Sequence, residues 1–194
     1  MKKLIALITV LLAVVIIFIG YNQTKDFEIE YEGLPEEYSE LLTLTGNKVL
    51  KYDLKNLSNE KSYEIGLVYE VYKNSQKVKE EKILGIGYGP TKEKIKDHEL
   101  AINIQDKKIR CITGENGGVY SYIDVEEDIS KFSYQCFEGG NKVNFGDDIY
   151  LFHGTSGEDG LRCYDLGKLS EEDKSSLVKH NDLNVFIKLV YEEI

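Results

Sequence analysis

Apolar and polar residues alternate along most of the chain after residue 26, which is the pattern of β-strands with one face in a core. In residues 63–72 every second side chain is large and apolar: Ile65, Leu67, Tyr69 and Val71. Similar runs separated by polar turns predict further strands at 27–32, 48–55, 77–87, 98–104, 109–113, 119–125, 132–137, 149–153, 161–166 and 183–193. The run 77–87 carries many charges before Ile83, so we expect it at a sheet edge.

Two stretches carry helix signals instead. Pro35, followed by acidic residues, predicts a short helix that ends near Gly46. Ser170, followed by three acidic residues, predicts a second helix with a serine cap. Leu177 and Val178 would dock this second helix against the strands.

About ten short strands without a β-helix-β rhythm predict an all-β fold, an antiparallel β-sandwich or barrel over residues 27–194. The segment from Lys48 to Val78 contains a strand, an Asn/Ser turn, an aromatic strand and a Lys-Asn-Ser-Gln hairpin. This arrangement resembles the immunoglobulin-like modules that bacteria tether outside their membrane. The resemblance implies an immunoglobulin-like or related sandwich, although the chain has no tryptophan for a Cys–Trp–Cys signature.

Residues 4–20 form an uncharged apolar run preceded by Lys2 and Lys3. As a helix this run is about 25 Å long, which is the short end of what spans a bilayer. Two interpretations stay open, an uncleaved transmembrane anchor and a cleaved signal. Bulky side chains at 17–19 stand where a signal peptidase needs small ones, and they favour the anchor.

The positive charges before the apolar run predict its orientation. We expect residues 1–3 to be a cytoplasmic tail, 4–20 a single transmembrane helix, 21–26 a short linker and 27–194 an extracytoplasmic domain. The expected location is therefore the cell membrane, with a single pass and the body outside.

The net charge of −10 limits the partners. An acidic protein is a poor ligand for nucleic acid, whose affinity for proteins comes from phosphate neutralisation. It is also repelled by an anionic membrane surface. Heavy use of Lys, Asn, Ile, Glu and Tyr, with no tryptophan, is typical of an AT-rich bacterial genome and so indicates a bacterial cell surface.

Three cysteines, Cys111, Cys136 and Cys163, allow at most one internal disulfide and leave a thiol over. Their spacing matches no zinc motif. Acidic turns at 126–128, 147–148 and 158–159 lack the spacing of a calcium loop. The sequence thus predicts no metal and no cofactor.

An N-terminal anchor, a β body, and His98 about 60 residues before Cys163 resemble the layout of the sortase transpeptidases. That resemblance implies a cell-surface thiol enzyme. Cys163, however, follows Gly-Leu-Arg rather than the sortase Thr-Leu-x-Thr motif, and no arginine comes after it. No catalytic set is therefore assembled by the sequence.

Tyr72, Tyr120 and Tyr122 fall on strand faces opposite the more aliphatic ones. Such tyrosines form either a protein or glycan contact or a second core layer. Our first hypothesis is a membrane-anchored, extracytoplasmic, non-enzymatic binding module for a protein or glycan of the cell envelope. The alternatives are the cell-surface thiol enzyme and an accessory subunit of a membrane complex that makes its contacts through 4–20.

Overall fold

The structure, a computed structural model, describes residues 27–114, 118–157 and 160–194. The expected tail, anchor and linker at 1–26 lie outside the described residues. Within the described ranges, no helix has the length and apolar character needed to cross a bilayer.

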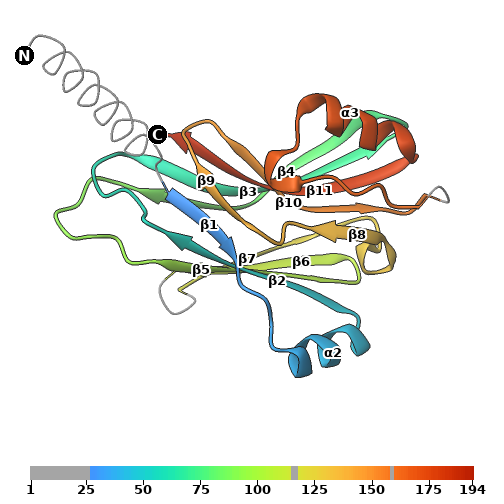
Figure 1. Cartoon of the computed structure of the whole chain (residues 1–194), viewed down its shortest axis with the longest axis horizontal. Helices are drawn as coiled ribbons and strands as arrows, with labels where there is room; N and C mark the ends of the chain where they lie inside the picture. Colours follow the sequence, from blue (N-terminus) through green and yellow to red (C-terminus); the bar gives the residue numbers. More distant parts are fainter. Residues whose placement is uncertain (1–26, 115–117, 158–159) are drawn as a thin grey trace, which may run out of the picture.

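Eleven strands in these ranges form two antiparallel sheets that face one another (Figure 1). The six-stranded sheet has the order β7-β6-β5-β2-β1-β9, with β1 Phe27–Tyr31, β2 Asn47–Lys55, β5 His98–Gln105, β6 Lys108–Gly114, β7 Val119–Asp124 and β9 Gly140–Val143. The five-stranded sheet has the order β4-β3-β11-β10-β8, with β3 Tyr63–Lys73, β4 Gln76–Tyr88, β8 Ser133–Cys136, β10 Asp148–Thr155 and β11 Leu183–Glu193. The predicted antiparallel sandwich is confirmed, and β4 lies at an edge as expected.

The core lies between the sheets because alternate residues of each strand point inward. The long pair β3 and β11 shows this, since Leu67 lies opposite Leu189 and Tyr69 opposite Ile187. All four side chains are buried. Burial of such a face supplies the main favourable term in folding, at roughly 25 cal/mol per Å² of apolar surface.

One end of the sandwich is sealed by aromatic rings from both sheets. The ring of Tyr191 on β11 lies 5.1 Å, centroid to centroid, from Phe27 on β1 and 5.1 Å from Tyr63 on β3. The start of β1 and the end of β11 therefore lie at the same end of the molecule (Figure 1).

The two α-helices sit differently on the sandwich (Figure 1). Helix α3, Glu171–His180, packs on the outer face of the five-stranded sheet with Leu177 and Val178 buried. Its cap is the predicted one, since Oγ of Ser170 accepts a hydrogen bond from the backbone N–H of Asp173 at 3.1 Å. Helix α2, Glu36–Leu44, projects from the sandwich and has no buried residue.

One predicted strand is wrong, and one observed strand has no counterpart in the sequence predictions. Residues 161–166 do not form a strand, and the chain instead enters the 3-10 helix η3, Leu166–Lys168. The backbone N–H of Tyr164 donates to the side chain of Gln135, and Asp165 caps Gly167, so no strand ladder forms. Strand β9 was not predicted, because its Gly-Asn-Lys-Val sequence shows no clear alternation. It forms by pairing with β1.

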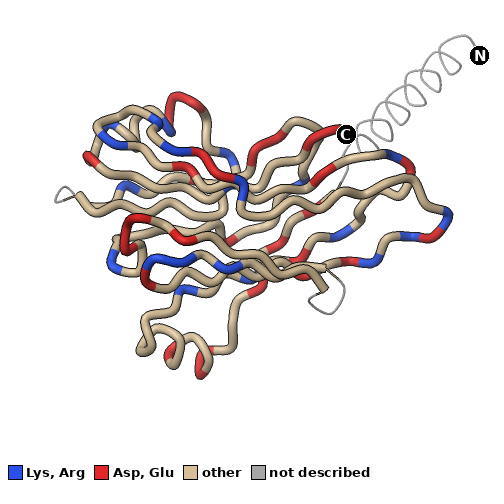
Figure 2. Tube along the Cα trace, turned by 180° about the vertical axis from the view of Figure 1, so that it is seen from behind, with Lys and Arg blue, Asp and Glu red and all other residues tan. Residues whose placement is uncertain are grey.

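The likeness to immunoglobulin-like modules is limited to the packing of two antiparallel sheets. Immunoglobulin constant domains divide seven strands between sheets of four and three. Here the sheets have six and five strands, and β5, β6 and β7 follow one another at one side of the larger sheet. Acidic and basic residues are interspersed along both sheets (Figure 2).

Candidate interaction surface

Tyr120 and Tyr122 lie on the outer face of β7, the last strand of the six-stranded sheet. They are 56% and 53% exposed, and their ring centroids are 6.1 Å apart. Between and beyond them, Ser121 and Ile123 point toward the core, as the alternation predicts. The hydroxyl of Ser121 donates to the backbone carbonyl of Ile83 on β4, which fixes β7 against the other sheet.

The structure adds a residue that sequence reasoning missed. Ile112 on β6 lies directly opposite Tyr120 in the strand register and is 43% exposed. We call Ile112, Tyr120 and Tyr122 the aromatic patch. The amino group of Lys108 lies 4.9 Å from the ring centroid of Tyr122, at the border of the patch. The sequence feature that could have identified Ile112 as outward-facing is its position between Cys111 and Thr113, which point inward.

Tyr72 does not belong to this patch. It lies on the outer face of the five-stranded sheet, half-buried beside α3. Its hydroxyl donates to Oε2 of Glu70 at 3.3 Å, and its ring meets Phe186 edge-on at 5.6 Å. The structure therefore separates the three tyrosines, and Tyr72 forms part of a second packing layer between sheet and helix.

That layer encloses a cation. The amino group of Lys174 on α3 lies 5.0, 4.7 and 5.5 Å from the ring centroids of Tyr72, Tyr150 and Phe186. It donates to Oε2 of Glu70 at 2.7 Å and to the Tyr150 hydroxyl at 2.6 Å. Burial by itself raises the pKa of Glu70, but the ammonium groups around it outweigh burial and lower the pKa overall. An aromatic cage of this kind suits a cationic ligand, and here the chain's own lysine fills it.

His153 is buried in the same layer at 1% exposure. Its Nε2 lies 3.0 Å from Oδ1 of Asn184, and its ring stacks on Phe186 at 4.6 Å. Burial lowers the pKa of this imidazole. A neutral, enclosed ring with these partners serves packing.

Two of the three thiols, Cys111 and Cys136, have a raised pKa, which is the opposite of what activates a nucleophile. All three cysteines are free. Burial raises the pKa of Cys111 to about 12, and burial together with the Glu138 carboxylate raises that of Cys136 to about 12. The strand register places Cys136 opposite Phe152 and Gln135 opposite His153, so the side chains of Cys136 and His153 lie on opposite faces of the sheet.

Cys163, the thiol that suggested a sortase-like enzyme, is exposed and lies in the irregular segment before η3. Its expected partner His98 lies at the start of β5, where its ring stacks on Tyr88 at 5.8 Å.

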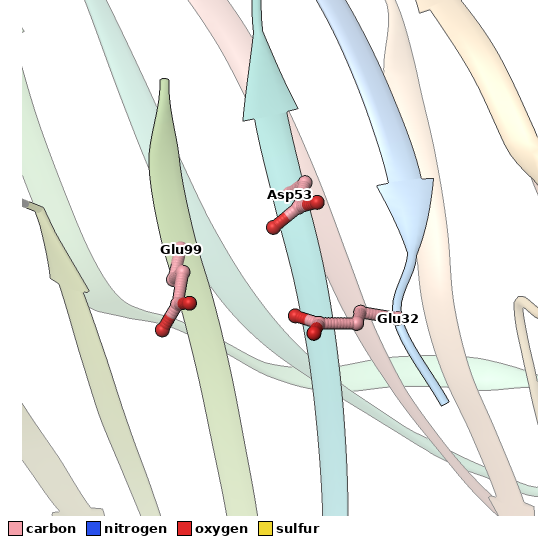
Figure 3. A group of neighbouring side chains, drawn as sticks. All are labelled: Glu32, Asp53 and Glu99. Carbon is pink, nitrogen blue, oxygen red and sulfur yellow. The ribbon is translucent and has the colours of Figure 1, made fainter. Parts of the chain in front are cut away.

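Three carboxylates in the described part of the chain, those of Glu32, Asp53 and Glu99, place oxygens within 4.8 Å of one another (Figure 3). They come from the end of β1, from β2 and from β5, which are distant in the sequence. No local sequence motif could therefore predict the cluster. The amino group of Lys51 lies 2.8 Å from Glu32 and 3.1 Å from Glu99, and that of Lys55 lies 3.6 Å from Asp53. These two lysines offset part of the acidic charge, and Lys55 also pairs with Glu30.

The acidic turns noted in the sequence have local structural roles. Glu127 pairs with Lys73 at 2.9 Å, and Asp128 pairs with Lys131 at 2.6 Å. Asp147 accepts from the backbone N–H of Asn144 at 2.8 Å. The third turn, 158–159, lies outside the described residues.

A pocket of about 430 Å³ lies between α2, β2 and β8. Its cationic group is the amino group of Lys48, which donates to the backbone carbonyls of Ser130 at 2.6 Å and Phe132 at 3.1 Å. The same group lies 4.5 Å from the ring centroid of Tyr134. These contacts tie β2 to the segment before β8.

Comparison of the chain with protein-family models, with curated proteins and with solved structures found no match.

Proposed function

We propose that this chain is a membrane-anchored, extracytoplasmic binding module that contacts a protein or glycan of the cell envelope through the aromatic patch. The observation that carries the proposal is the exposure of Ile112, Tyr120 and Tyr122 side by side on one sheet face. Tyrosines combine a large apolar ring with a polar hydroxyl, which suits them to partly hydrated contacts.

The way in which β7 is held in the fold favours a binding role for the aromatic patch over a role in the core. Strand β7 is held by β6 along its length and by the bond from Ser121 to Ile83, so the rings are presented from a rigid surface. A rigid aromatic surface loses little conformational entropy when it binds. The anchor at 4–20 would place this surface outside the membrane.

The thiol enzyme is the weaker alternative. Nucleophilic cysteines need a lowered pKa, whereas the pKa values of Cys111 and Cys136 are raised. The accessory-subunit alternative assigns the contact to 4–20, and an exchange of this segment tests it. If an unrelated transmembrane sequence replaces 4–20, the binding module retains its partner and the accessory subunit loses it.

Photo-crosslinking tests the proposal in the full chain. A benzoylphenylalanine at position 122, expressed in the source cells, is expected to give a discrete adduct with an envelope protein or glycan. The same group at Val78, which is 54% exposed on β4, serves as the matched control. The adduct should fall at least tenfold when Tyr120→Ser is added. Equal labelling from both positions, or no adduct from position 122, would refute a contact at the aromatic patch.

A further inference from the structure

Helix α2 presents three of its four large apolar side chains to solvent. Tyr38 is 62% exposed, Leu41 59% and Leu44 85%, which are the highest values among the large hydrophobics of the described strands and helices. They are spaced three residues apart, so they lie along one broad side of the helix. A soluble protein rarely gathers such side chains on one element unless they are covered by something else.

Contacts with the described body of the protein do little to stabilise α2. It has nine residues, and no side chain caps its first turn. Helices this short are marginal in water without tertiary contacts. Helix α3 is of similar length but buries Leu177 and Val178, whereas α2 reaches the body through the half-buried Leu42 at the rim of the pocket.

The charges on α2 narrow the choice of partner. Glu36, Glu37 and Glu40 are all exposed, and the helix carries no basic residue (Figure 2). Pairing of α2 with the α2 of a second copy would bring two such sets of carboxylates together, and like charges across an interface disfavour it. An anionic membrane surface would repel the helix for the same reason.

We propose that α2 docks into an apolar groove, rimmed by lysine or arginine, on another protein. In this mode a short amphipathic helix inserts anchors at regular spacing, here Tyr38, Leu41 and Leu44. Glu40 lies beside the anchors, and Glu37 lies one turn before Leu41 on the same face, so both would pair with basic residues where the groove ends. This surface is separate from the aromatic patch, because α2 lies beside β2 while the patch lies on β6 and β7.

The test again uses the full chain in its source cells. Benzoylphenylalanine replaces Leu41, and the same group at Val78 is the control. The expected result is a protein adduct from position 41 only, with the crosslinked partner peptide lying in an apolar segment next to Lys or Arg. Reversal of the helix charge by Glu36→Lys, Glu37→Lys and Glu40→Lys should reduce this adduct at least tenfold.

Two further variants separate an effect of α2 itself from effects of net charge and of folding. Reversal of the exposed Glu60, Glu192 and Glu193 changes the net charge equally and should leave the adduct unchanged. Leu44→Asp removes an anchor at an exposed site and should also reduce the adduct tenfold, while the thermal unfolding midpoint stays that of the parent chain. An adduct with a second copy of the chain or with lipid, an adduct that survives the reversal on α2, or no adduct would each overturn the proposal. Loss of the adduct at position 122 alone would leave it intact.

Discussion

The amino group of Lys174 on α3 lies 2.7 Å from Oε2 of Glu70 on β3, and their side chains are only 9% and 1% exposed. This ion pair joins residues that are 104 positions apart in the chain. Two more lysines, Lys77 and Lys188, place their amino groups 3.5 Å from Oε1 of the same carboxylate. Glu70 is therefore the centre around which α3 is fixed to the sheet.

Replacing Glu70 by Gln should destabilise the protein strongly. The substitution leaves the buried ammonium of Lys174 without its counter-charge, and loss of one partner of a buried pair costs about 3–5 kcal/mol. Urea unfolding measures the change. Lys82→Met breaks the more exposed pair with Glu64 and is the control, with an expected cost of about 0–1 kcal/mol. Equal costs for the two variants would contradict the role assigned to Glu70.

The stability of the fold should decline in mild acid because of His153. Burial lowers the pKa of its imidazole below the ordinary value of 6.5, so the unfolded chain binds the proton more readily than the folded one. The stability that the neutral imidazole contributes is fully present above pH 6.5, the pKa of the unfolded chain. It is lost as the pH falls through the lower pKa of the folded protein. Gln135, Asn184 and Phe186 face the ring, and none of them titrates in this range.

Unfolding free energies measured between pH 7.5 and 5 test this prediction. His153→Gln should flatten the part of the pH dependence that arises from the imidazole, while carboxylates contribute the same slope to both proteins. Identical pH profiles for the two proteins would show that the histidine is not held neutral by burial.

Alkylation of the thiols should be confined at first to Cys163. It is exposed, whereas the pKa values of Cys111 and Cys136 are about 12. At neutral pH a thiol with such a pKa is thiolate at a level on the order of 10⁻⁵, and the thiolate is the reactive form. Limiting iodoacetamide followed by peptide mass spectrometry should label Cys163 at least about tenfold faster than the others. Rapid labelling of Cys136 would instead favour the thiol enzyme.

The serine cap of α3 should contribute measurably to the free energy of unfolding. Ser170→Ala removes the acceptor for the backbone N–H of Asp173 and is expected to cost about 1 kcal/mol. Ser170→Thr retains a hydroxyl that can accept from this N–H and donate to the Asp173 carboxylate, as Ser170 does, and should cost only about a few tenths of a kcal/mol. Thermal unfolding of both variants makes the comparison. A similar loss in both would mean that the cap itself contributes little.

Local patterns predicted the parts of this structure that depend on near neighbours. The outward direction of Tyr120 and Tyr122 follows from alternation within one strand, because successive side chains point to opposite faces. The serine cap at Ser170 depends on a contact three residues away. The edge position of β4 follows from its own charges. The cap and the edge position are confirmed, and Tyr120 and Tyr122 do lie on the face of β7 opposite Ser121 and Ile123.

Local sequence patterns gave wrong or incomplete predictions where segments distant in the chain determine the surroundings of a residue. Tyr72 and Tyr120 have the same strand signature, yet Tyr72 is partly covered because α3, about 100 residues later, packs on its face. The predicted strand at 161–166 lacks a partner ladder, since its backbone bonds to a side chain of β8. The short β9 exists only because β1 offers it an edge.

The sequence by itself determined that the described body is all-β and antiparallel, a sandwich or a barrel, and which side of most strands enters its core. The reason is that a period of two in hydrophobicity is a property of each strand alone. Only the tertiary structure decided that Ile112 lies beside Tyr120, that Lys174 fills the cage above Glu70, and that α2 buries no residue among the described parts of the chain. Those facts depend on strand order and on which elements meet, and these are set by the packing of the whole chain.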